Sequence, residues 1–76
     1  AMPYVALKVY PKDPETEKKL ADKIYQDILD IWGCPPQAIH ISLEEVAPED
    51  WNEKVREPEI DTKLDKMLVL DGVKKY

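Results

Sequence analysis

The chain has few of the residues that build several common kinds of site. Its single cysteine, Cys34, excludes an internal disulfide framework and a cysteine-based zinc cluster. It also has one histidine, so a metal site would need mostly carboxylates, and we expect none. The two glycines, Gly33 and Gly72, stand alone, which excludes a glycine-rich phosphate-binding loop.

Long apolar runs and an excess of positive charge are also missing. No apolar run approaches the ~20 residues that span a bilayer, and no basic stretch with an apolar core opens the chain. The 16 acidic and 11 basic residues give a net charge of −5. This balance argues against nucleic acid and anionic membranes as partners. With neither a secretion signal nor disulfides, we expect a cytoplasmic protein.

The composition is that of a small globular protein. The 76 residues are 43% apolar and 36% charged, and we expect a single domain over 1–76. Ala1 is interpreted as a residue left by cloning ahead of a native initiator Met2. Because initiator methionine is removed efficiently before proline, the native chain is expected to begin at Pro3.

The first half of the sequence predicts a strand, a helix and a second strand. Apolar and polar residues alternate over 3–10 and again over 38–46, which is typical of strands with one buried face. Between them, Asp13 and Pro14 form a helix start, and Gly33 ends the predicted helix 14–32. An apolar stripe recurs every four residues along this helix: Leu20, Ile24, Ile28 and Trp32.

The predicted fold is therefore α/β (α+β), a βαβ unit with two parallel strands and one long helix. A short helical extension is expected to follow: a helix over 48–57 broken by Pro58, then a helix near 59–69 that Asp71-Gly72 ends, with 73–76 as a tail. Two parallel strands leave open edges and one uncovered face. We therefore predict an obligate oligomer, most simply a two-fold dimer that completes the sheet.

Few residues have the character of catalytic groups. A free Pro3 would carry a secondary amine, which is a base that a sheltered site can tune toward neutrality. His40 lies on the polar face of the second strand, where it can donate a hydrogen bond, although a lone strand histidine is more often structural. Cys34 follows a helix C-terminus, which raises a thiol pKa and disfavours a nucleophile. Glu44 and Glu45 point to opposite faces, so they cannot act as a pair.

Taken together, these positions resemble the 4-oxalocrotonate tautomerase family of the tautomerase superfamily. The resemblance covers nearly the whole chain and rests on three features: Met2-Pro3 opening a strand, the helix 14–32, and the run Ala38-Ile39-His40-Ile41-Ser42-Leu43-Glu44-Glu45-Val46-Ala47-Pro48-Glu49-Asp50-Trp51. The part from Ser42 to Trp51 is most similar to the longer, homodimeric members. The helix expected near 59–69 agrees with that group.

The resemblance implies roles for five residues. Pro3 matches the N-terminal proline that acts as general base and then general acid. His40 falls where many members have an arginine that binds the substrate, and Trp51 where they have a pocket aromatic residue. A second arginine position is occupied by Asp13, so adjacent Lys12 is the candidate cation. Tyr10 is expected to line the pocket from the same or the partner subunit.

The implied function is cofactor-independent keto-enol tautomerisation of a small 2-oxo/2-hydroxy-enoate (enolpyruvate-type) acid by a homodimeric isomerase. The absence of both arginines favours a monocarboxylate over a dicarboxylate substrate. If Ala1 and Met2 are retained, the Pro3 nitrogen is an amide and this form is expected to be inactive. Two alternatives stay open: a non-catalytic binding domain on the same fold, and a hydratase- or dehalogenase-like enzyme that uses the same proline.

Overall fold

The computed structural model describes residues 3–76 and divides the chain into two compact units, the first ending at Glu45 and the second spanning Val46–Tyr76. The predicted single domain over 1–76 stays a prediction. Ala1 and Met2, on which the expectation of a processed N-terminus rests, lie outside the described residues.

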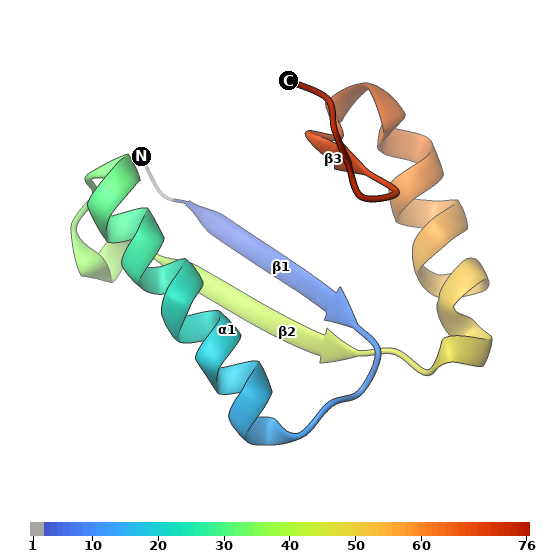
Figure 1. Ribbon diagram of the computed structural model, residues 1–76, viewed down its shortest axis with the longest axis horizontal. Coiled ribbons are helices and arrows are strands. Elements are labelled where there is room, and N and C mark those ends of the chain that lie inside the picture. Colours follow the sequence, from blue (N-terminus) through green and yellow to red (C-terminus); the bar gives the residue numbers. More distant parts are fainter. Residues whose placement is uncertain (1–2) are drawn as a thin grey trace. The chain divides into compact units, whose positions relative to one another are not determined.

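The first unit is the predicted βαβ arrangement. Strand β1 (Tyr4–Val9) pairs in parallel with β2 (His40–Glu45), and helix α1 (Pro14–Asp27) connects them along one face of the sheet (Figure 1). The register places Tyr4 opposite His40 and runs to Val9 opposite Glu45. The predicted α+β fold class and parallel pairing are confirmed.

Local sequence signals set both ends of the helix. The Asp13 carboxylate caps α1 by accepting a hydrogen bond from the Thr16 backbone N–H at 2.9 Å, and Pro14 is the first helical residue. Beyond Asp27 the helix continues as the π-helical turn η1 (Ile28–Trp32). It ends at Gly33, whose φ of 77° is the left-handed conformation that glycine adopts without strain. The predicted helix 14–32 is confirmed, with a widened last turn.

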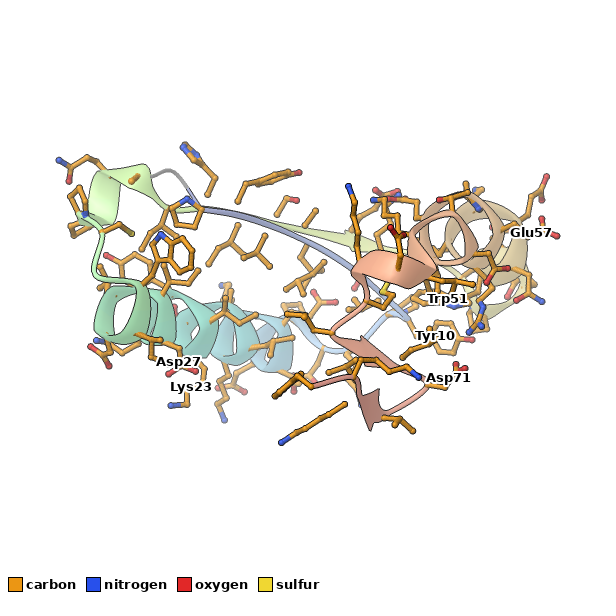
Figure 2. The ribbon with its side chains drawn as sticks, turned by 90° about the horizontal axis from the view of Figure 1, so that it is seen from above. Tyr10, Lys23, Asp27, Trp51, Glu57 and Asp71 are labelled. Atoms are coloured by element: carbon orange, nitrogen blue, oxygen red, sulfur yellow. The ribbon has the colours of Figure 1, made fainter. Side chains whose placement is uncertain are left out.

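The aliphatic faces of the strands turn toward α1, as predicted. Val5 of β1 lines a hollow together with Ile24 and Ile28 of the helix segment. Ile41 and Leu43 of β2 line a second hollow with α1 residues. The opposite side of α1 is polar: Lys23 and Asp27 form an ion pair of 3.2 Å on the side of the helix away from the sheet (Figure 2). The short 3₁₀ turn η2 (Pro36–Ala38) leads into β2 and contains the buried Ala38.

The second unit begins with helical segments but differs from the prediction at Pro58. A 3₁₀ turn, η3 (Pro48–Asp50), leads through Trp51 into the π-helix η4 (Asn52–Ile60), which contains Pro58 in its interior. In an α-helix the proline ring clashes with the carbonyl four residues earlier. The wider turns of η4, in which the Asp61 N–H donates to the Arg56 carbonyl, accommodate the ring. The predicted break at Pro58 is therefore wrong.

The end of the chain differs more strongly. In place of the helix predicted near 59–69, η5 (Asp61–Lys66) is 3₁₀-helical and has a kink at Lys63, whose dihedral angles are non-helical (φ −131°, ψ 28°). Strands β3 (Val69–Leu70) and β4 (Val73–Lys74) then form an antiparallel hairpin, in place of a helix end and a tail. Asp71 and Gly72 both have positive φ, as a two-residue hairpin turn requires. The Asp-Gly pair is thus a hairpin signal here and not a helix stop.

Arg56 ties this hairpin to the preceding helix. Its Nε donates to Asp61 Oδ1 at 3.0 Å, and its Nη1 donates to Asp71 Oδ1 at 2.8 Å. These hydrogen bonds to carboxylates raise the pKa of Arg56 and lower the pKa of Asp71. The only arginine of the chain therefore has a structural role within the second unit.

Candidate functional site

Parallel pairing brings the two strongest candidate residues together. Pro3 precedes β1 and His40 opens β2, so both lie at the same end of the sheet. The His40 backbone N–H donates a hydrogen bond to the Pro3 carbonyl at 3.2 Å. This bond fixes the backbone of Pro3 against the second strand, and the Pro3 side chain is half-buried.

The face of the sheet away from α1 is polar next to Pro3. Tyr4 lies directly opposite His40 in the register, and Ala6 lies opposite Ser42. The Tyr4 hydroxyl reaches diagonally to the Ser42 hydroxyl, with an oxygen–oxygen distance of 3.4 Å. One imidazole and two hydroxyls therefore gather on this exposed face.

Tyr4 and Ser42 were not among the residues predicted for the site. The alternation of the strands already placed both on the polar face, but alternation alone does not show which residues of two distant strands become neighbours. The register supplies that information. Aligning the first residues of the two predicted parallel strands would have placed Tyr4 and Ser42 beside His40.

Tyr10 and Lys12 lie at the other end of β1. Tyr10 directly follows the strand, and Lys12 lies in the loop that leads to Asp13 and α1. At about 3.3 Å per residue, the strand separates them from Pro3 by roughly 20 Å. Within one copy of the chain, the structure thus does not bring Tyr10 or Lys12 to the Pro3 end of the sheet.

Trp51 belongs to the second unit. It is half-buried where η3 joins η4 and acts as the N-cap position of η4. The sequence interpretation of Trp51 as a pocket aromatic residue stays a prediction.

The carboxyl group of Glu17, in the first turn of α1, interacts with the carboxyl group of Glu45 at the end of β2. The pKa of Glu17 is raised, first by a hydrogen bond with the Glu45 carboxyl and then by burial and by repulsion from the same group. Glu17 Oε2 is buried and has no hydrogen-bond partner in residues 3–76. By contrast, the hydrogen bonds from Thr16 lower the pKa of Asp13. Asp13 is thereby committed to capping α1.

Comparison with known proteins identifies the relatives of this chain. Tautomerase PptA of Enterobacter sp. (strain 638) is 33% identical over 73 residues, which is 93% of this chain and 96% of the relative. The chain belongs to the tautomerase superfamily. Tautomerase PptA of Cronobacter sakazakii (strain ATCC BAA-894) is 31% identical over the same shares of both chains. A probable tautomerase of Xylella fastidiosa (strain 9a5c) is 26% identical, over 93% of this chain and 88% of the relative. No protein-family model matches the chain.

Membership of the tautomerase superfamily agrees with the parallel β1–β2 pair and its connecting helix. The names of the relatives support a tautomerase, and hence isomerase, activity in general terms. They leave the substrate and the reacting groups to be inferred from the residues of this chain.

Residues 3–76 show neither a metal site nor a membrane span. Among these residues, no group of three or more histidine, cysteine, aspartate or glutamate side chains is arranged to hold a metal ion. None of the helices in the same part of the chain has the length and apolar character needed to cross a membrane.

Proposed function

We propose that this member of the tautomerase superfamily isomerises a small 2-oxo/2-hydroxy-enoate acid by keto-enol tautomerisation, with Pro3 as general base and then general acid. The observation that carries the proposal is the junction of Pro3 with His40 at the open end of the parallel sheet. The relatives named tautomerases support the reaction class.

The chemistry follows from the two residues. A chain that begins at Pro3 has a secondary amine, and its neutral nitrogen takes a proton from the enol hydroxyl or from the α-carbon. The electron pair moves through the enol system, and the protonated proline returns a proton to the other position. His40 donates a hydrogen bond to the oxygen on which negative charge develops. No electron leaves the substrate, so the proposed reaction needs no cofactor.

Tyr10, Lys12 and Trp51 are proposed to complete the pocket around Pro3. Because Tyr10 and Lys12 lie at the far end of β1, they contribute to a Pro3 site only from a second copy of the chain. Trp51 is proposed as an apolar wall that keeps the proline nitrogen near neutrality. The roles of Tyr10 and Lys12 require the homodimer that the open sheet favours.

A non-catalytic binding domain is the second candidate function. Asp13 occupies a position where related enzymes carry a cation, and its carboxylate is used to cap α1. A site without that cation binds an anion more weakly. A domain of this kind would keep the fold and the polar face but would not need a free Pro3.

Ketonisation of an aromatic enolpyruvate, followed by its ultraviolet absorbance, separates the candidates. We expect turnover by protein that begins at Pro3, none by the form that retains Ala1 and Met2, and a loss of at least about 100-fold in kcat/KM for Pro3→Ala. A roughly ten-fold loss is expected for His40→Ala because a donor to the enolate oxygen is removed. Equal rates for the two N-terminal forms would contradict the proline mechanism.

A further inference from the structure

A carboxylate substrate needs a binding group, and the usual cations are committed or distant. Arg56 is held by Asp61 and Asp71 in the second unit. Within one copy of the chain, Lys12 lies about the length of β1 away from Pro3. Lys8 lies further along the polar face, where its register partner is the acidic Glu44. The groups on the same face that are closest to Pro3 are uncharged hydroxyls and the imidazole of His40.

We propose that the Tyr4 and Ser42 hydroxyls, on the same face of the sheet as His40, form the site that binds the carboxylate of the substrate. The inference rests on the proposed tautomerase function and assigns a substrate-binding site within it.

The arrangement of the three donors fits a 2-oxo acid. Tyr4 and His40 are register partners on adjacent strands, about 4.8 Å apart across the sheet. Ser42 lies two residues after His40 on the same face, about 6.6 Å along the strand. These are backbone spacings; the Tyr4 and Ser42 hydroxyl oxygens themselves lie 3.4 Å apart, so both can donate to one carboxylate and leave His40 for the adjacent oxygen. Ala6, between Tyr4 and Lys8, adds only a methyl group to this part of the face.

The Tyr4 and Ser42 hydroxyls contact each other only weakly, so both can donate hydrogen bonds to a bound anion. Their oxygen–oxygen distance of 3.4 Å is longer than the 2.5–3.0 Å usual for hydroxyl hydrogen bonds. A carboxylate accepts shorter and stronger bonds than another hydroxyl does. Tyr4 is 66% exposed, so its hydroxyl is accessible to a ligand. Binding would exchange one long hydroxyl–hydroxyl contact for two charge-assisted bonds.

The two hydroxyls are uncharged donors, and this defines the substrate class. They stabilise one carboxylate by hydrogen bonding, without a cation to balance a second one. A monocarboxylate, such as an arylenolpyruvate, is therefore preferred to a dicarboxylate. Binding of the carboxylate by the two hydroxyls depends little on ionic strength, because neither hydroxyl carries a full charge.

The test uses protein that begins at Pro3 and measures kcat and KM for an arylenolpyruvate and for its methyl ester. Tyr4→Phe and Ser42→Ala are each expected to raise KM for the acid roughly ten-fold, with kcat within about two-fold. KM for the ester, which lacks the anion, is expected to be unchanged. Tyr25→Phe removes the same hydroxyl from an exposed position on α1 and serves as the matched control.

The outcomes separate the two proposals. Turnover that depends on Pro3, combined with unchanged KM in both variants, would overturn the carboxylate site and leave the proposed function standing. An equal rise in KM for acid and ester would also overturn the carboxylate site, since the hydroxyls would then not distinguish the carboxylate from its ester. Absence of turnover by protein with a free Pro3 would overturn the proposed function and this site with it.

Discussion

Glu17 shows how one side chain links protonation to folding. Its carboxyl meets Glu45 at the end of β2, and one of its oxygens is buried without a partner in the described chain. The uncharged form is favoured there because the two carboxylates repel and burial disfavours charge. The pKa of Glu17 is therefore raised above its ordinary value of 4.5 in the folded protein.

The raised pKa predicts a pH dependence of stability. Because the folded state binds the proton more tightly, the stabilisation is complete below about pH 4.5 and is lost as the pH rises through the folded pKa. Glu17→Gln keeps an uncharged side chain at all pH values. We expect it to raise the unfolding temperature at pH 7 by a few degrees and to leave it unchanged near pH 4.

Thermal unfolding followed by circular dichroism at several pH values measures this effect. Glu15→Gln, in the same helical turn but exposed, removes the same charge and is the matched control. A gain of equal size in both variants would show that net charge, and not the contact with Glu45, determines the effect.

At the scale of the element, the start of α1 depends on Asp13. Its carboxylate accepts hydrogen bonds from both the backbone N–H and the hydroxyl of Thr16, at 2.9 and 2.8 Å. Such a cap satisfies a donor that the first helical turn leaves unpaired. The same bonds lower the pKa of Asp13 below its ordinary value of 3.8.

Loss of this cap is expected to destabilise the protein. We predict that Asp13→Ala lowers the unfolding temperature by roughly 5 °C at pH 7, and that Asp13→Asn, which keeps an acceptor oxygen, loses much less. Because the folded pKa is lowered, the advantage of the wild-type side chain exists above pH 3.8 and disappears as the pH falls through the folded pKa. A constant difference between wild type and Asp13→Ala down to pH 2 would contradict this account.

At the scale of the whole molecule, the first unit taken by itself has open strand edges and exposed apolar side chains. Its sheet has two strands and two open edges. Ile31 and Trp32 are 82% and 64% exposed, and they line an apolar hollow with Val5 and Ile28. Within residues 3–76, the only buried apolar residues are Ala38 in the first unit and Val46 and Val55 in the second. A core this small favours association.

We therefore expect a dimer in solution. Sedimentation velocity at micromolar concentration is predicted to give twice the chain mass, and the unfolding temperature is predicted to rise with protein concentration. Ile31→Asp should shift the species toward monomer because it places a charge on the apolar surface. Lys19→Asp, on the polar side of α1, is the control and should remain dimeric. A monomer that unfolds cooperatively at all concentrations would contradict the prediction.

Features with short-range causes were predictable from the residues alone. The helix begins at Asp13-Pro14 and ends at Gly33 because capping and backbone conformation depend on a few neighbouring residues. The strands follow from the alternation of apolar and polar residues. Each of these signals lies within a few positions of the structure that it specifies.

The register and the second unit depended on contacts between distant or competing segments. Tyr4, His40 and Ser42 become neighbours only through the pairing of β1 with β2, which no local pattern states. Pro58 lies inside a helix because that helix adopts wider turns, and Asp71-Gly72 forms a hairpin that Arg56 holds. Local propensity is weak compared with packing and pairing energies. Tertiary contacts therefore determine that Asp71-Gly72 forms a hairpin turn and not a helix end.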